Sequence, residues 1–386
     1  MGRPRIAIVS AEDTRSRQAW SGSPFYMAAA LERHVGDVVH LGPVTSPVEL
    51  AAKVRNRIAK QVTGRGMPYQ HSRSVAADYA RIFRRRLRDA GVVDLIFAPA
   101  AATQLALLET DIPVVYTSDT TFQLMRDYYP GFSGLDDAYA DGGNDIERRA
   151  LHRSAAVIYP SEWAARSART FYGVPAERVH VVPYGANLDA VPPRDAVTAA
   201  GRADRRSILF LGVDWERKGG AIAYDAVAAL RARGVEATLT VCGCTPPAHY
   251  RAPWLHVVPR LDKNVPEQQR ELSRLLLEAS FLLVPSRQEC YGIVFCEASA
   301  HGTPAIATDT GGIAGAVSVG ESGMLFPENA SPAAYADAMA SLLADRARYQ
   351  AMVASSRAHF EQTVNWDVWG RRVAGITAPL LAAESR

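Results

Sequence analysis

Two glutamates on either side of a glycine are the residues of this sequence best suited to chemistry. Glu289 and Glu297 are separated by seven residues, and Gly292 lies between them. They follow the apolar run 279–284, which we expect to form a buried strand, and Glu297 falls on the helix expected next. Such a loop, at the carboxyl end of a parallel strand and before a helix, typically holds a phosphorylated ligand. The structural alternative is that one glutamate caps the helix and the other lies on a solvated face.

A second loop carries the charges that a diphosphate requires. After the expected strand 208–211 and Gly212, the chain places Arg217 and Lys218 directly before two glycines. Two cations at the start of a helix can neutralise a diphosphate, both while it is bound and as it leaves. Lysine is rare in this chain, with only four among 43 Lys and Arg residues, which favours a functional role for Lys218. The spacing is not that of a P-loop.

Two stretches in the first half of the chain are further candidates. Residues 20–24 include Gly22 and Ser23 and precede a helical run, whose start could receive a phosphate; an ordinary capped helix explains the pattern equally well. Residues 117–122 open a loop at the carboxyl end of an expected strand. The aromatic and acidic residues that follow suit a polyhydroxy or amine-bearing acceptor, and packing between helices is an equal alternative.

An α/β fold must position these loops. Short apolar runs alternate with amphipathic helical stretches along the chain, which predicts parallel sheets covered on both faces. The runs expected to form strands are 6–9, 38–41, 95–98, 114–116, 156–159, 179–182, 208–211, 237–241, 255–258, 281–284 and 305–308. A proline-led linker, residues 191–201, separates the two series. We therefore expect two Rossmann-like domains that face each other across a cleft.

Size, charge and cysteine content exclude several classes of protein. The chain of 386 residues is too long for one typical core, and its net charge of +3 argues against a dedicated nucleic-acid binder. The four cysteines, too few for a disulfide framework and expected to be small buried residues, are Cys242, Cys244, Cys290 and Cys296. No uncharged apolar run approaches the roughly 18 residues of a membrane span, so we expect a cytoplasmic protein.

Residues 74–90 form an expected helix with one apolar and one basic face. Tyr79, Phe83 and Leu87 lie on the apolar side, and arginines surround the other. Weak contact with an anionic membrane surface is one interpretation of the basic face. A solvated face is the other, and we favour it.

Several motifs, taken in their order and spacing, resemble the family-4 retaining glycosyltransferases of GT-B fold. These motifs are residues 161–163, 182–189, 216–219, the pair Glu289 and Glu297, and residues 298–304, 309–313 and 365–367. The resemblance extends over the whole chain. It implies an N-terminal acceptor-side domain of residues 1–190, with the helix 371–386 packing back on it. Residues 191–370 would form the domain that binds the nucleotide sugar.

The resemblance also implies roles for individual residues. Glu289 would contact the hydroxyls of the donor sugar, and Glu297 would accept hydrogen bonds from both ribose hydroxyls. Arg217 and Lys218 would bind the departing diphosphate. The other residues implied at the donor are Gly22, Ser23, Gly212, Arg260, Leu261, Tyr291, Gly292, Ile293 and Val294. Ser118 and Asp119 join the catalytic candidates, and the acceptor candidates are Thr120, Phe122, Tyr128, Tyr129, Tyr184 and Asn187.

The sequence departs from the family pattern at two positions. Val213 follows Gly212 where an arginine is common in the family, so Arg217 would have to carry more of the phosphate binding. Ser118 precedes Asp119 where a histidine is common, which leaves the identity of the donor sugar open.

The expected activity is transfer of a sugar from a UDP- or GDP-linked donor to a small-molecule or glycan acceptor, with retention of configuration. No Asp-x-Asp motif occurs, so we expect no metal, and the nucleotide sugar is a substrate, so we expect no cofactor. No carboxylate is clearly placed as a nucleophile, unlike in glycosidases, which favours substitution on the same face of the sugar. Two alternatives remain: a hydrolysing sugar-nucleotide 2-epimerase, and a non-catalytic subunit that binds a nucleotide sugar.

Overall fold

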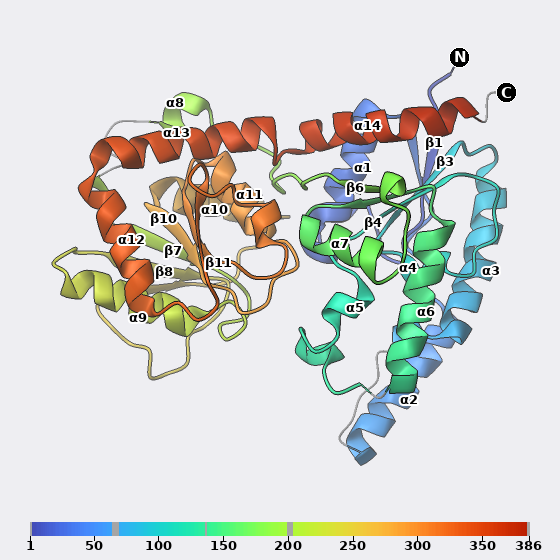
Figure 1. Ribbon diagram of the computed structural model, residues 1–386, viewed down its shortest axis with the longest axis horizontal. Coiled ribbons are helices and arrows are strands. Elements are labelled where there is room, and N and C mark those ends of the chain that lie inside the picture. The colour runs from blue at the N-terminus through green and yellow to red at the C-terminus, as the bar shows by residue number, and fades with distance from the viewer. Residues whose placement is uncertain (1, 64–68, 136, 199–203, 384–386) are drawn as a thin grey trace. The chain divides into compact units, whose positions relative to one another are not determined.

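The computed structural model describes residues 2–63, 69–135, 137–198 and 204–383. The chain divides into two compact units, which Figure 1 colours from blue to red along the sequence. One unit is Met1–Val182 together with Trp369–Arg386, and the other is Pro183–Val368. Parts of the expected linker (residues 199–201) and of the expected C-terminal helix (residues 384–386) lie outside the described residues.

The first unit is built on a parallel sheet of six strands in the order β2-β1-β3-β4-β5-β6. Its strands are β1 (Arg5–Ile8), β2 (Asp37–His40), β3 (Leu95–Pro99), β4 (Val114–Thr117), β5 (Ala156–Tyr159) and β6 (Val179–Val181). The strands β3, β4 and β5 are buried along their whole length. This burial explains why they read as unbroken apolar runs in the sequence.

Seven helices of the first unit connect these strands. They are α1 (Ser23–His34), α2 (Pro47–Thr63), α3 (Arg73–Ala90), α4 (Ala102–Leu105), α5 (Phe122–Met125), α6 (Asp137–Arg153) and α7 (Glu162–Thr170). Short 3-10 turns are η1 (Ala19–Gly22), η2 (Tyr69–His71), η3 (Pro130–Phe132) and η4 (Ala176–Arg178). Helix α4 packs beside both α3 and α6. The expected apolar face of α3 is confirmed, because Tyr79, Phe83 and Leu87 are buried and its arginines point to solvent.

The second unit also contains a parallel sheet of six strands, in the order β12-β11-β10-β7-β8-β9. Its strands are β7 (Ser207–Leu211), β8 (Thr238–Cys242), β9 (Leu255–Val258), β10 (Phe281–Val284), β11 (Ala305–Thr308) and β12 (Gly323–Phe326). Every strand expected from the sequence is present. The edge strand β12 was not expected, although three of its four residues are apolar; only its first residue, Gly323, is fully buried.

Helices cover this second sheet as well. They are α8 (Arg194–Val197), α9 (Gly220–Ala232), α10 (Pro266–Glu278), α11 (Ile293–Ala300), α12 (Pro332–Ala344) and α13 (Arg346–Gln362), with a 3-10 turn at Ile313–Gly315. Helix α12 packs along α9, and α13 packs along α11. Each unit has its own core of buried aliphatic and aromatic side chains. The expectation of an α/β protein with two Rossmann-like domains is therefore confirmed.

The last helix, α14 (Trp366–Ala383), begins in the second unit and continues in the first. Within the first unit, Trp369 is fully buried and its indole packs edge-on against Phe97 of β3. Gly370 lies where an added Cβ would come within 2.5 Å of the His34 ring, so α14 approaches α1 closely. Among the described residues, no helix has both the length and the apolarity that crossing a bilayer requires.

Candidate functional site

The strand order of the second unit places two functional loops side by side. Strand β7 pairs with β10, although β8 and β9 lie between them in the sequence. From β7 the chain continues to β8 on one side, and from β10 it continues to β11 on the other. All these strands are parallel, and the direction in which successive strands are added reverses between β7 and β10; we call this point the strand reversal. In open α/β sheets, ligands bind at the carboxyl ends of the strands beside such a reversal. The loops that carry Arg217 and Glu289 leave the sheet there.

A glycine allows these two loops to touch. Gly219 has a φ of +75° and caps the N-terminus of α9. A Cβ at this position would lie 2.0 Å from the carbonyl oxygen of Pro285, so no other residue fits without moving the backbone. The backbone N–H of Arg287 also donates to the carbonyl of Arg217 at 2.7 Å. The two loops are therefore held in register by main-chain contacts.

The side chains of the two loops meet in a buried ion pair. The ammonium of Lys218 binds the carboxylate of Glu289, and both residues are less than a tenth exposed. The Arg217 guanidinium lies 3.9 Å from the same carboxylate and donates to the carbonyl of Gln288 at 3.1 Å. Gly212 makes room for this arrangement, since a Cβ there would lie 2.8 Å from Cγ of Lys218. Two cations and one carboxylate are thus concentrated at a single point.

The second glutamate forms a separate pair. Glu297 lies on α11 and is 1% exposed, and its carboxylate binds the ammonium of Lys263 from the loop after β9. A buried carboxylate requires such a partner or several hydrogen-bond donors. In the predicted loop around Lys263, Arg260 is exposed and Leu261 half-buried. Lys263 follows Arg260 and Leu261, which were implied at the donor, but the sequence did not reveal its pairing with Glu297.

Both loops end at helix N-termini that are capped by glycine. Gly292, with a φ of +88°, caps α11, which begins at Ile293 and Val294. Gly219 caps α9 in the same manner. The first N–H groups of a helix have no acceptor within the helix, and the helix dipole adds partial positive charge there. A diphosphate would find two such termini here beside the cations Arg217 and Lys218.

The predicted residues Tyr184, Asn187 and Tyr291 lie in a tightly packed cluster in the second unit. The ring of Tyr184 stacks on Trp366 at 5.8 Å between centroids, and the indole N–H of Trp366 donates to Asn187 at 3.1 Å. The Tyr291 hydroxyl donates to the carbonyl of Tyr184 at 3.1 Å. All three are nearly inaccessible to solvent. Val213, at the position where the family commonly has arginine, is 61% exposed.

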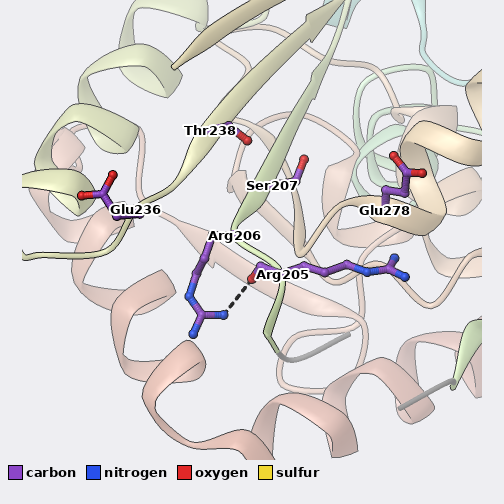
Figure 2. Close-up of a pocket in the computed structure, with 6 residues that line it drawn as sticks. All are labelled: Arg205, Arg206, Ser207, Glu236, Thr238 and Glu278. Atoms are coloured by element: carbon purple, nitrogen blue, oxygen red, sulfur yellow. Dashed lines mark hydrogen bonds between the residues drawn. The ribbon is translucent and has the colours of Figure 1, made fainter. Parts of the chain in front are cut away.

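A different surface hollow of the second unit lies at the amino ends of β7 and β8, at the opposite edge of the sheet (Figure 2). Charged residues that line this hollow form hydrogen bonds and ion pairs with other residues of the protein. Arg206 donates to the carbonyl of Arg205 at 2.8 Å, and Glu236 forms an ion pair with Arg231 at 2.7 Å. Ligands of such sheets bind at the carboxyl ends. We therefore place no ligand here.

In the first unit, a cavity of about 210 Å³ collects four of the predicted residues. Ser118, Asp119 and Thr120 follow β4, and Phe122 begins α5; all four line the cavity. Asp119 accepts a hydrogen bond from the indole of Trp20 at 3.1 Å. Nearby, Tyr128 packs against Tyr129 and Trp163 and does not line it.

The lining residues that the sequence did not single out include Trp20, His71 and Glu147. The signal for Glu147 was available. The buried residues of α6 include Ala140, Gly143, Asn144, Glu147 and Leu151, which recur at the period of a helix. An acid on the face that packs against the protein interior marks a candidate site. No comparable pattern points to Trp20 or His71.

The remaining predicted donor residues of the first unit are Gly22 and Ser23. Gly22 has a φ of +91° and caps α1, which begins at Ser23. The residues just before it, Trp20 and Ser21, have φ values of +46° and +56°, which are uncommon for residues other than glycine. The structure therefore has a helix start of the kind expected for a phosphate contact. That contact remains a prediction.

The four cysteines are free thiols. Cys242, Cys290 and Cys296 are buried, and Cys244 is partly buried. Burial raises the pKa of Cys242 to about 11 and that of Cys296 to about 12, so both stay protonated at neutral pH. These thiols pack as small apolar groups, as the sequence predicted.

Comparisons with known proteins agree with this geometry. Residues 25–190 match the family model described as Glycosyltransferase Family 4, and residues 205–345 match the one described as Glycosyl transferases group 1. A D-inositol 3-phosphate glycosyltransferase from Jonesia denitrificans is 30% identical over 284 residues, which cover 68% of this chain and 65% of that protein. One from Streptomyces bingchenggensis is 34% identical over 258 residues, covering 62% and 55%. The chain thus spans less than two thirds of the length of these relatives.

Solved structures show the same fold. Sucrose-phosphate synthase from Thermosynechococcus elongatus aligns over 99% of this chain and 100% of its own, with a TM-score of 0.69 and 20% identity. HepE from Anabaena, solved in complex with UDP and glucose, aligns over 98% and 100%, with a TM-score of 0.63 and 15% identity. Family models that match both halves of the chain, and the strand order of its two sheets, lead to one assignment. The chain belongs to the family-4 glycosyltransferases and has the GT-B fold.

Proposed function

We propose that this protein transfers a sugar from a nucleoside-diphosphate sugar, linked to uridine or guanosine, to a small-molecule or glycan acceptor. One observation carries the proposal: Arg217, Lys218 and Glu289 converge at the strand reversal of the second sheet beside two helix N-termini, and Glu297 lies on α11, the helix that begins at one of them. The arrangement has donors for a diphosphate and carboxylates for hydroxyl groups. A nucleotide sugar presents both kinds of group.

Each side chain has a role in this proposal. Arg217 and Lys218 bind the diphosphate and stabilise the negative charge that grows on it as the sugar departs. Glu289, already held by Lys218, accepts hydrogen bonds from the sugar hydroxyls. Glu297 accepts hydrogen bonds from the two ribose hydroxyls, and Lys263 pairs with this buried carboxylate.

We further propose that the anomeric configuration is retained and that no metal ion takes part. The bond from the anomeric carbon to the diphosphate breaks, and the acceptor oxygen bonds to the same face of the sugar. The acceptor proton passes to an oxygen of the leaving diphosphate. The cations Arg217 and Lys218 supply the charge that a metal ion would otherwise supply. The nucleotide sugar is consumed as a substrate, so no cofactor is required.

The Anabaena structure, which was solved with UDP and glucose bound, supports a uridine nucleotide among the two candidates. The names of the inositol-phosphate relatives support a cyclitol as one class of acceptor. For this chain we therefore propose a uridine nucleotide as the donor and a cyclitol as one class of acceptor. Neither the donor sugar nor the acceptor follows from the nucleotide site itself.

The proposal is tested with the full chain and a panel of UDP- and GDP-sugars. We expect slow release of the nucleoside diphosphate without acceptor, faster release with one, and no loss of rate in EDTA. NMR of the glycoside should show the anomeric configuration of the donor. An inverted product would refute the same-face mechanism. Binding of donors without turnover, with every acceptor tried, would identify a non-catalytic nucleotide-sugar-binding subunit instead.

A further inference from the structure

The cavity of the first unit has a charge that restricts what it can bind. It lies at the carboxyl ends of β3 and β4 and is bounded by α5 and α6, which Figure 1 shows in the teal and green part of the chain. At about 210 Å³ it is smaller than the roughly 300–1,000 Å³ of pockets for drug-sized ligands. It therefore has room for one small ring.

Two acids line the cavity, and no lysine or arginine is among its described lining residues. Glu147 is 3% exposed, and its carboxyl accepts a hydrogen bond from the Tyr116 hydroxyl at 3.3 Å. Burial raises the pKa of Glu147 to about 8. Asp119 contributes the second carboxyl group. The cavity thus offers carboxyl oxygens as hydrogen-bond acceptors, and Glu147 becomes a negative charge when it loses its proton.

The histidine of the cavity does not offset this charge. Burial lowers the pKa of His71 to about 4, so its ring is neutral at pH 7. Its Nδ1 is buried and has no hydrogen-bond partner among the described residues. A buried polar atom without a partner is uncommon and is explained when a ligand supplies one. A neutral imidazole has one donor and one acceptor nitrogen, which suits a ligand hydroxyl.

Aromatic rings form one wall of the cavity. The centroid of His71 lies 4.9 Å from that of Phe122, and Phe122 lies 5.8 Å from Phe132. Gly143 of α6 allows this packing, because a Cβ there would lie 2.2 Å from the Phe122 ring. Aromatic faces attract cations and also pack on the apolar faces of sugar-like rings. The wall is thus compatible with a cationic ring compound.

Backbone strain is concentrated at the same place. Trp20 and Ala100, which both line the cavity, have φ values of +46° and +47°. Such conformations are unfavourable for residues with a side chain, and they cluster at binding and catalytic sites. This is an observation independent of the charges, and it points to the same cavity.

A phosphorylated ligand is poorly suited to these surroundings. A phosphate group would carry about two negative charges beside two carboxyl groups, with no described lysine or arginine in the lining to neutralise them. The names of the relatives specify an inositol phosphate as substrate. The acid-lined cavity of this chain favours the opposite charge.

We propose that the cavity binds the acceptor of the transfer, that this acceptor is a small hydroxylated ring bearing a primary ammonium group, and that Glu147 is the counter-ion of the ammonium. The inference rests on the glycosyl transfer proposed above. Ring hydroxyls would be met by the hydroxyls of Ser118 and Thr120 and by the imidazole of His71. The aromatic wall of Phe122 and Phe132 would lie against the ring.

Proton release accompanies this binding and gives a specific signature. In the empty cavity Glu147 keeps its proton at pH 7, whereas the free amine is already an ammonium ion. Formation of the ion pair requires the carboxylate, so the carboxyl proton passes to the buffer. One proton is therefore released for each amine bound, close to stoichiometrically at pH 7.

The experiment is titration calorimetry of the full chain at pH 7, in two buffers that differ in ionisation enthalpy. The probes are scyllo-inosamine, myo-inositol and myo-inositol 3-phosphate. We expect the amine to bind at least about tenfold more tightly than the neutral polyol, the phosphate not to bind, and nearly one proton to be released with the amine. Tightest binding of the phosphate, equal binding of amine and polyol, or binding of the amine without proton release would each overturn the inference.

Two variants make the test specific to Glu147. Glu147→Gln keeps the shape and the neutral state of the buried carboxyl group, so the fold should be maintained. The variant should release no proton when the amine binds, and its affinity for the amine should be at least about tenfold lower. Its affinity for myo-inositol should be unchanged. Asp141→Asn removes an exposed carboxylate from the same helix and should change neither quantity. Loss of amine affinity in both variants would assign the effect to overall charge and refute the counter-ion role.

The outcome is separable from that of the proposed function. Release of the nucleoside diphosphate without acceptor does not require an occupied acceptor cavity, so the wild type and Asp141→Asn, which changes an exposed residue, should release it at the same rate. A wild-type protein that neither binds nor hydrolyses any nucleotide sugar would count against the transfer itself. A wild-type protein that hydrolyses a nucleotide sugar but binds the amine no more tightly than myo-inositol would refute only the inference that the acceptor carries an ammonium group.

Discussion

The ammonium of Lys218 pairs with the carboxylate of Glu289, although 71 positions separate them in the chain. The pair joins the loop after β7 to the loop after β10, at the strand reversal of the second sheet. Both groups are buried, so each depends on the other to offset the cost of leaving water. The proposed donor site is thus partly preformed before any ligand binds.

This pair should be visible in a double-mutant cycle. Removing one partner of a buried pair leaves a buried charge, so Lys218→Met and Glu289→Gln should each lower the free energy of unfolding, Lys218→Met by about 3 kcal/mol. The double variant should lose less than the sum of the two singles, because it leaves no unpaired charge. Urea unfolding of the four proteins measures the coupling. Additive losses would show that the two side chains do not interact in solution.

Glu297 should control nucleotide binding. In the wild type, UDP or GDP should raise the midpoint of thermal unfolding, since a ligand at 100 times its Kd stabilises by about 2.7 kcal/mol. Glu297→Gln should largely remove this rise, because a neutral amide cannot accept two hydrogen bonds as well as a carboxylate does. Asp225→Asn, which changes an exposed residue of α9, is the matched control, and the nucleotide should raise its unfolding midpoint as much as that of the wild type. If the nucleotide raised the unfolding midpoint of Glu297→Gln as much as that of the wild type, Glu297 would not be the residue that binds the ribose hydroxyls.

Stability should depend on pH through Glu147. The pKa of Glu147 is about 8 in the folded protein, whereas the ordinary value for a glutamate, 4.5, applies to the unfolded chain. Between these two pH values the folded state retains a proton that the unfolded state loses. The stabilisation is complete below about pH 4.5 and is lost as the pH rises through 8. The free energy of unfolding should fall by up to about 1.4 kcal/mol per pH unit within this window.

The range from pH 6.5 to 8 isolates this effect. His71, with its pKa lowered to about 4, has the opposite sign and reduces stability only as the pH falls below about 6.5. Urea unfolding of the wild type should therefore show stability decreasing from pH 6.5 to 8. Glu147→Gln should show a flat profile there. An unchanged slope in the variant would contradict the raised pKa.

Gly219 should tolerate no side chain. Gly219→Ala forces alanine to a φ of +75° and places its Cβ 2.0 Å from the Pro285 carbonyl oxygen. The conformational cost alone is about 1–2 kcal/mol, and the clash adds to it, so the loss of stability should exceed about 2 kcal/mol. Gly234→Ala has a similar φ of +83° with open space around the Cβ, and should cost about 1 kcal/mol. Equal losses in a chemical denaturation experiment would show that the two loops do not touch.

The sequence by itself determined the class of fold and the loops that carry the chemistry. The strands β3, β4 and β10 are buried on both faces, so their apolar runs are local signals that any reader of the sequence can find. The edge strand β12 was not predicted: it has only four residues and begins at a glycine, a residue that is depleted in strands. The spacing of Glu289, Gly292 and Glu297 likewise marks a ligand loop without reference to the rest of the chain.

Only the tertiary structure decided which charges meet. Lys263 pairs with Glu297 across 34 positions, and Glu147 meets Tyr116 across 31, and neither pairing follows from periodicity. Helical and strand periods report which face of an element is buried, but not which element it packs against. The strand order and the contacts between loops fix that choice. The acid-lined cavity therefore became visible only in the folded chain, whereas the sequence had already suggested a polyhydroxy or amine-bearing acceptor.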